Sequence, residues 1–271
     1  MDLDHARAVA VEAAEAAGAL LLEGTRGALG VRAKGDAGDV VTDLDLASEK
    51  LLLERILTAY PSHSVIAEES GVVEGAGGEW TWLVDPLDGT NNVAIGLPAY
   101  VVGVALCRAG RPVLGVVHDP VSARTLSAIR GRGTLSCPAG ASSGVRLAPS
   151  YEPRPHGPLV AWTQGYAVAR DDATGRVLRS ALELGARRVL QLWAPLLAWA
   201  MLARGAIDGI VGYRAEVVDL PAGALLALEA GIEIRALDGG PFEEGIDGTA
   251  EDRSFVAAHP RALPELLALL R

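Results

Sequence analysis

The sequence predicts a mixed α/β fold in which helices cover the faces of a sheet. Two observations lead to this prediction. Segments with helical periodicity alternate with short apolar runs typical of buried strands, most regularly in the second half of the chain. Half of the 271 residues are hydrophobic and 21% are charged, which is the balance of a globular protein and excludes a disordered or collagen-like chain.

The first half of the chain is expected to begin with helices and continue with strands. Residues 3–24 carry apolar side chains at helical spacing, residues 31–41 suggest a loop or weak hairpin, and a second helix runs from about 42 to 60, where Pro61 stops it. Strands are expected at 64–67, 80–84, 100–107, 112–118 and 124–130. The strand at 80–84 should break at Asp85-Pro86.

A stretch rich in Pro, Gly and Ser at residues 137–157 is the expected boundary between subdomains 1–145 and 146–271. The first would carry most of the candidate metal ligands. Beyond the boundary the expected elements are a strand at 159–162, a helix at 171–184, a further strand, a helix at 193–203, a strand at 207–211 and a helix at 220–230.

Charge and cysteine usage exclude several classes of protein. The 24 basic and 34 acidic side chains give a net charge of −10, so nucleic acid is not an expected ligand. Cys107 and Cys137 form neither a disulfide framework nor a metal-binding pattern. The acidic start lacks a signal-peptide pattern, and the apolar stretches 189–203 and 220–228 are too short or interrupted for a membrane span. We therefore expect a cytoplasmic protein that acts away from membranes.

Five acidic residues stand out by their context: Asp45, Glu68, Asp85, Asp88 and Asp219. Each has a purely structural interpretation; Asp45 could close a capping box and Asp219 could cap a helix. Taken together they suggest a metal site, because Glu68 and Asp85 directly follow apolar strands, where ligands collect in α/β sheets. Carboxylates and a free backbone carbonyl, here that of Leu87, are the ligands of hard divalent cations, so we expect Mg²⁺ rather than zinc.

A candidate phosphate site follows directly after these carboxylates, in Gly89-Thr90-Asn91-Asn92. A short helix beginning here would present free N–H groups to an anion, and Gly89 would let a phosphate approach the backbone. Thr90 adds a hydroxyl beside both the metal and the anion. Carboxylates for metals beside amides for phosphate predict metal-assisted hydrolysis of a phosphate ester.

Three segments resemble the signatures of the inositol monophosphatase family. They are Glu68-Glu69-Ser70, Trp82-Leu83-Val84-Asp85-Pro86-Leu87-Asp88-Gly89-Thr90-Asn91-Asn92 and Asp219-Leu220-Pro221-Ala222-Gly223-Ala224, in the family's order and separation. The resemblance runs from about residue 5 to the C-terminus. It implies a layered αβαβα sandwich of the inositol monophosphatase and fructose-1,6-bisphosphatase type, magnesium dependence and a phosphoric monoester hydrolase.

The resemblance also implies roles for individual residues. Glu68, Asp85, Asp88 and the Leu87 carbonyl would bind one Mg²⁺, Asp85, Asp88 and Asp219 a second, and Glu68 with waters a third. Thr90, oriented by Asp45, would help to deprotonate the attacking water, Glu69 would support the water shell, and Gly89 and Thr90 amides would bind phosphate. Lys34 and Asp39 align with a mobile loop, although a solvated loop charge is an equal interpretation of Lys34.

The sequence departs from the family pattern where the substrate's alcohol should lie. Gly212 stands where inositol-hydrolysing members carry a glutamate, and Trp193 begins the segment Trp193-Ala194-Pro195-Leu196, where members usually have small residues. Losing a hydroxyl-binding carboxylate should alter selectivity. The alternative is that Trp193 and Trp199 only pack a helix into the core.

Two classes of function remain open. The first is an Mg²⁺-dependent phosphomonoesterase that acts on a small phosphorylated metabolite such as a polyol, sugar or inositol phosphate. Within this class a histidinol-phosphate or 3′-phosphoadenosine-type phosphatase is an alternative, in which Trp193 would stack on a base. The second is a non-catalytic metal-binding protein that docks to a partner. The abundance of small residues suggests a homodimer, and so does the family resemblance, because members of that family commonly dimerise.

Overall fold

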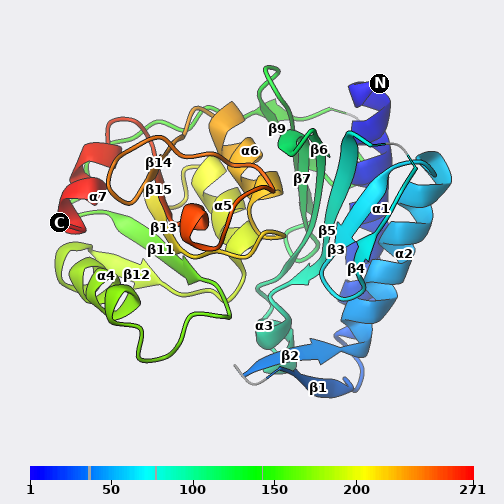
Figure 1. The fold of residues 1–271 in the computed structure, drawn as a ribbon, viewed down its shortest axis with the longest axis horizontal. Coiled ribbons are helices and arrows are strands. Elements are labelled where there is room, and N and C mark those ends of the chain that lie inside the picture. The colour runs from blue at the N-terminus through cyan, green and yellow to red at the C-terminus, as the bar shows by residue number, and fades with distance from the viewer. Residues whose placement is uncertain (36–37, 77, 142) are drawn as a thin grey trace.

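The structure, a computed structural model, describes residues 1–35, 38–76, 78–141 and 143–271. Its elements form five layers (Figure 1): α1 and α2, an eight-stranded sheet, α5 and α6, a five-stranded sheet, and α4 with α7. The helices are α1 Leu3–Gly24, α2 Asp43–Ala59, α3 Thr90–Ala94, α4 Ala173–Gly185, α5 Pro195–Ala203, α6 Pro221–Glu229 and α7 Leu263–Leu269, with a 3₁₀ turn at Glu251–Arg253. This is the mixed α/β, αβαβα arrangement that the sequence predicts.

The larger sheet has the strand order β10-β9-β8-β7-β6-β5-β3-β4, and within the described part of the chain β3 and β5 are its only parallel neighbours. Its strands are β3 Ser64–Ala67, β4 Gly71–Val73, β5 Trp80–Asp88, β6 Val101–Arg108, β7 Arg111–Asp119, β8 Arg124–Ile129, β9 Thr134–Pro138 and β10 Val145–Arg146. A separate hairpin pairs β1 Val31–Lys34 with β2 Asp39–Thr42. The expected weak hairpin is thus present, with residues 36 and 37 outside the described residues.

The smaller sheet has the order β12-β11-β13-β15-β14 and mixes parallel and antiparallel pairs. Its strands are β11 Leu159–Gln164, β12 Arg188–Leu190, β13 Gly209–Tyr213, β14 Glu233–Ala236 and β15 Phe255–Ala258. Both sheets contribute to one hydrophobic cluster around α5 and α6. The division into subdomains at residues 145 and 146 therefore stays a prediction.

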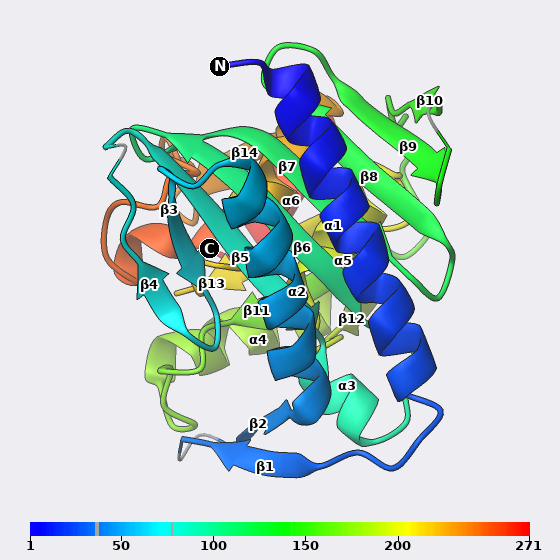
Figure 2. The same cartoon turned by 90° about the vertical axis from the view of Figure 1, so that its right-hand side faces the viewer.

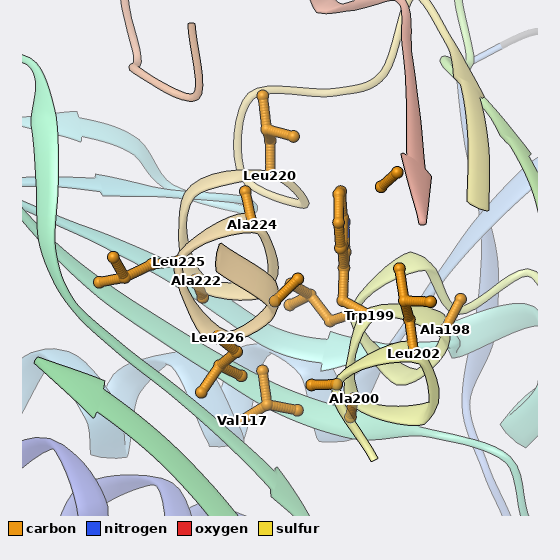
Figure 3. Close-up of a cluster of buried hydrophobic side chains, with 14 of the residues drawn as sticks. Val117, Ala198, Trp199, Ala200, Leu202, Leu220, Ala222, Ala224, Leu225 and Leu226 are labelled. Atoms are coloured by element: carbon orange, nitrogen blue, oxygen red, sulfur yellow. The ribbon is translucent and has the colours of Figure 1, made fainter. Parts of the chain in front are cut away.

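Small side chains hold the layers close together. The buried face of α1 is mostly alanine, which lets this helix lie close to the larger sheet beside α2 (Figure 2). In the central layer Trp199 of α5 rises beside α6 (Figure 3) and stacks on Phe255 with ring centroids 5.0 Å apart. A Cβ on Gly223 of α6 would lie 2.3 Å from the Trp199 ring. Only glycine therefore allows α6 to pack here.

Several elements differ from the expectation. The strand expected to break at Asp85-Pro86 continues to Asp88 through a register shift between Asp85 and Asp88, and such a bulge accommodates a proline. Strands β4, β9, β10, β14 and β15 and helix α7 were not predicted, since each is short and carries little periodic signal. Across the described residues, no helix has both the length and the apolar character that crossing a bilayer requires.

Candidate active site

Three carboxylates from distant parts of the sequence meet between the two sheets. Asp85 and Asp88 lie at the end of β5, and Asp219 lies two residues before α6. One oxygen from each of the three lies within 4.8 Å of the others. Asp219 does not cap α6, whose N-cap is Leu220, so the structural interpretation of this residue is wrong. Its carboxylate faces the other two instead.

The electrostatics of this cluster fit a divalent cation. Burial, followed by repulsion from neighbouring carboxylates, raises the pKa of Asp85 and of Asp219 well above the ordinary value. Burial also raises the pKa of Asp88 to about 8, although the Leu197 N–H donates to its Oδ2 at 3.0 Å. Buried like charges at this distance are costly unless a cation compensates them. An all-oxygen cluster of this kind suits Mg²⁺.

Glu68 and Glu69 lie beside the cluster and hold Lys34. The Lys34 Nζ donates to Glu68 Oε1 at 2.9 Å and to Glu69 Oε1 at 2.6 Å. Burial opposes the charge of Lys34, but the two carboxylates outweigh it and raise its pKa. Lys34 is therefore not a solvated loop charge: it ties the hairpin β1–β2 to the turn after β3. Glu68 also lies close enough to Asp85 to help raise the pKa of that carboxyl, after burial, which places it beside the three aspartates.

Asp45 combines two functions that the sequence left as alternatives. Its Oδ2 accepts hydrogen bonds from Thr42 Oγ1 at 2.5 Å and from Thr42 N at 2.8 Å, which completes a capping box at the start of α2. Its Oδ1 accepts from Thr90 Oγ1 at 2.7 Å. Thr90 Oγ1 also lies 3.0 Å from the Leu87 carbonyl oxygen. One buried carboxylate thus caps a helix and orients the Thr90 hydroxyl.

Gly89 makes the sharp turn that separates Asp88 from α3. Its φ is +108°, and a Cβ there would lie 2.7 Å from the Ala99 carbonyl oxygen, so only glycine fits. The helix α3 begins immediately afterwards at Thr90. The first N–H groups of a helix have no partner within it and are open to an anion. Asp39 of the hairpin reaches this turn, accepting a hydrogen bond from Asn91 Nδ2 at 3.2 Å.

One residue that positions the site, Glu49, and one long-range contact, made by Asn92, were missed in the sequence. Glu49 is buried and accepts hydrogen bonds from the N–H groups of Glu69 at 2.8 Å and Ser70 at 2.9 Å. Its position one helical turn after Asp45 was a usable signal, because residues i and i+4 share a helix face. Asn92 Nδ2 donates to the carbonyls of Ala99 and Leu192, both at 2.6 Å. No sequence pattern indicated that long-range contact.

An open cavity of about 870 Å³ lies next to the carboxylates, lined among others by Asp39, Asn91, Tyr166, Trp193 and Asp219. Trp193 is 54% exposed, whereas Trp199 is 1% exposed. Core packing therefore accounts for Trp199 but does not account for the exposed Trp193. Tyr166 lines the same cavity, and burial followed by the nearby Asp219 and Asp39 carboxylates raises the pKa of its hydroxyl.

Gly212 is buried in β13, opposite Phe255 of β15. A Cβ at this position would lie 2.3 Å from the Phe255 ring. We expect Gly212→Glu to destabilise the protein by more than about 1–3 kcal/mol, the usual cost of overpacking, because the new carboxylate would also be buried, and not to improve hydrolysis of inositol 1-phosphate. Thermal melting and a phosphate-release assay check this. An unchanged melting temperature with a gain in inositol phosphate turnover would contradict it.

Comparison with known proteins agrees with this geometry. The sequence matches the Inositol monophosphatase family over residues 2–271. It is 32% identical to the Nus factor SuhB of Escherichia coli strain K12 over 270 residues, covering 97% of this chain and 94% of that protein. The structure resembles the extragenic suppressor protein suhB from Bartonella henselae, with a TM-score of 0.84, 26% identity and 97% of each chain covered. It also resembles the inositol monophosphatase from Anabaena, with a TM-score of 0.81 and 27% identity, covering 100% of this chain and 96% of that one. The chain belongs to the inositol monophosphatase family.

Proposed function

We propose that this protein is an Mg²⁺-dependent phosphomonoesterase that hydrolyses a small phosphorylated metabolite. The observation that supports this most directly is the meeting of Asp85, Asp88 and Asp219 within 4.8 Å. A hydroxyl held by a carboxylate, the Thr90–Asp45 pair, lies at the start of the helix that follows. Metal ligands, a candidate base and a candidate phosphate site are thus adjacent.

Glu68, Asp85, Asp88, Asp219 and the Leu87 carbonyl would hold the ions. When bound, Mg²⁺ supplies Lewis acidity toward the phosphate and lowers the pKa of water. The chain's own part is to place the phosphate against the Gly89 and Thr90 amides. As Thr90 Oγ1 accepts a proton from the attacking water, its own proton passes along the 2.7 Å hydrogen bond to Asp45.

The surrounding residues would keep this arrangement in place. Glu69 would support the water shell, and Lys34 and Asp39 would close the hairpin β1–β2 over the carboxylates. The contacts of Lys34 with Glu68 and Glu69, and of Asp39 with Asn91, support this proposal. The hairpin would thereby exclude bulk water from the phosphate and strengthen the electrostatic interactions inside.

The test is phosphate release with Mg²⁺ from a panel of monoesters: inositol 1-phosphate, glycerol 2-phosphate, ribose 5-phosphate, histidinol phosphate and adenosine monophosphates. We expect turnover on at least one ester, and its loss when EDTA removes the metal. Folded protein that hydrolyses none of them would rule out the proposal. The panel also separates polyol and sugar phosphates from the histidinol-phosphate and 3′-phosphoadenosine-type alternatives.

A second candidate is a docking protein, which the name Nus factor, carried by the SuhB relatives, brings forward. In that case the fold would serve a partner and hydrolysis would be incidental. The complete set of carboxylates favours the enzyme. Complementation of a deletion strain by a hydrolysis-deficient Asp88→Asn protein would favour docking instead.

A further inference from the structure

We propose that the alcohol part of the substrate carries a flat heterocyclic ring, which stacks on Trp193. This inference rests on the proposed phosphomonoesterase function and names its substrate class. Trp193 is the largest exposed side chain in the wall of the cavity that also contains Asp219. An indole left open to solvent beside the metal ligands is a ready surface for a planar ring, because stacking removes one apolar face of each ring from water.

The backbone that carries Trp193 is fixed to the reacting centre on both sides. The Leu192 carbonyl accepts a hydrogen bond from Asn92 Nδ2 at 2.6 Å, and the Leu197 N–H donates to Asp88 Oδ2 at 3.0 Å. Between these anchors Trp193 has a φ of +52°, a conformation that a bulky residue rarely adopts. The Trp193 backbone is therefore held at a set place relative to Asp88, and the indole leaves it at the wall of the cavity.

The rest of the cavity suits a ring better than a polyol. Gly212, expected from the sequence in the substrate wall, instead faces Phe255 inside β13, so this position offers no carboxylate to a polyol. Tyr166, 48% exposed, and the exposed Ile95 add further apolar surface to the wall. Gln164 and Gln191 line the same cavity, and amides pair with the nitrogen and oxygen atoms at the edge of a heterocycle. The volume of about 870 Å³ is large enough for a nucleoside.

The experiment compares esters that differ only in the ring. Adenosine 5′-monophosphate is paired with ribose 5-phosphate, and histidinol phosphate with ethanolamine phosphate, in the wild type, Trp193→Ala and Trp193→Phe with Mg²⁺. We expect the wild type to prefer a ring-bearing ester. Trp193→Ala should lower kcat/KM for that ester about tenfold or more, which is the usual loss of one stacking contact, and change the ring-free partner less than about twofold. Trp193→Phe should restore most of the loss. A Trp193-dependent preference for adenosine 5′-monophosphate would indicate a nucleobase, and one for histidinol phosphate would indicate an imidazole.

A matched control variant and a binding measurement distinguish loss of stacking from a general effect of removing an exposed apolar side chain. Leu184→Ala removes another exposed apolar side chain, 87% exposed on α4, and should leave every ester unchanged. Melting curves show that each variant is folded, and quenching of tryptophan fluorescence by adenosine monophosphate should weaken in Trp193→Ala.

Three outcomes would overturn the inference. Equal hydrolysis of ring-bearing and ring-free esters, unaffected by Trp193→Ala, overturns it and leaves the proposed function standing. A uniform loss on all esters, together with a change in mass by light scattering, makes Trp193 a subunit contact. No turnover on any ester by folded protein removes both proposals.

Discussion

Replacing Asp88 with asparagine is expected to lower phosphate ester hydrolysis on the order of 10³-fold while raising the melting temperature of the metal-free protein. The two effects have the same cause. Asp88 is a buried carboxylate beside Glu68, and its pKa is raised from 3.8 to about 8 because burial disfavours the charge. Asparagine keeps the shape and has no charge, so folding no longer requires this side chain either to take up a proton or to bury a charge.

The raised pKa of Asp88 also predicts how the stability of the metal-free protein depends on pH. Between pH 3.8 and about 8 the folded protein holds a proton on Asp88 that the unfolded chain has released. The metal-free wild type should therefore lose stability as pH rises through this window, and Asp88→Asn should lose less. Each kcal/mol would shift the melting temperature by roughly 2–4 °C in a protein of this size.

Melting curves with EDTA and with Mg²⁺, at pH 5 and pH 8, check the prediction. Mg²⁺ should stabilise the wild type and stabilise Asp88→Asn much less, because the ion binds only the native site. The exposed Asp238 provides a control, and Asp238→Asn should change neither activity nor the response to Mg²⁺. A variant that melts lower than the wild type in EDTA would contradict the electrostatic account.

Thr90→Ala is expected to lower kcat roughly 10²–10⁴-fold, the range that proton transfer by a positioned group contributes. Thr90→Ser should recover most of this, since it supplies the same hydroxyl to Asp45. Asp45→Asn should cost a comparable amount. Because the two side chains share one hydrogen bond of 2.7 Å, the double variant should be hardly worse than either single one.

Thr42→Ala separates the two effects of Asp45, which orients the Thr90 hydroxyl and stabilises the start of α2. It removes the capping-box hydroxyl but keeps the Asp45–Thr90 hydrogen bond, so it should lower stability by about 1 kcal/mol and preserve most of kcat. Steady-state kinetics and thermal melting on all five variants supply the comparison. Additive losses in Thr90→Ala and Asp45→Asn, or an equal loss of kcat in Thr42→Ala, would show that Asp45 acts only through the helix.

Much of the fold could be predicted because its signals are local. The helical periodicity of residues 3–24, the stop at Pro61 and the capping pair Thr42 and Asp45 each depend on neighbours along the chain. The short strands β14 and β15 have no such signal; they exist because β15 pairs with β13 across the smaller sheet. The end of β5 was misplaced for the same reason. Its pairing with β6 resumes at Asp88 after the bulge and outweighs the proline.

In the candidate site, too, some features follow from the sequence and others only from the tertiary structure. The sequence by itself determined the chemical groups, since the run from Asp85 to Asn92 and the residues Glu68 and Asp219 specify oxygen ligands, a turn and a hydroxyl. The tertiary structure alone decided which side chains meet. It brings Lys34 to Glu68, supports the turn after β3 with Glu49, and turns Trp193 toward the cavity while Trp199 enters the core. Short-range preferences act over a few bonds, whereas these contacts join segments that only the packed layers bring within reach.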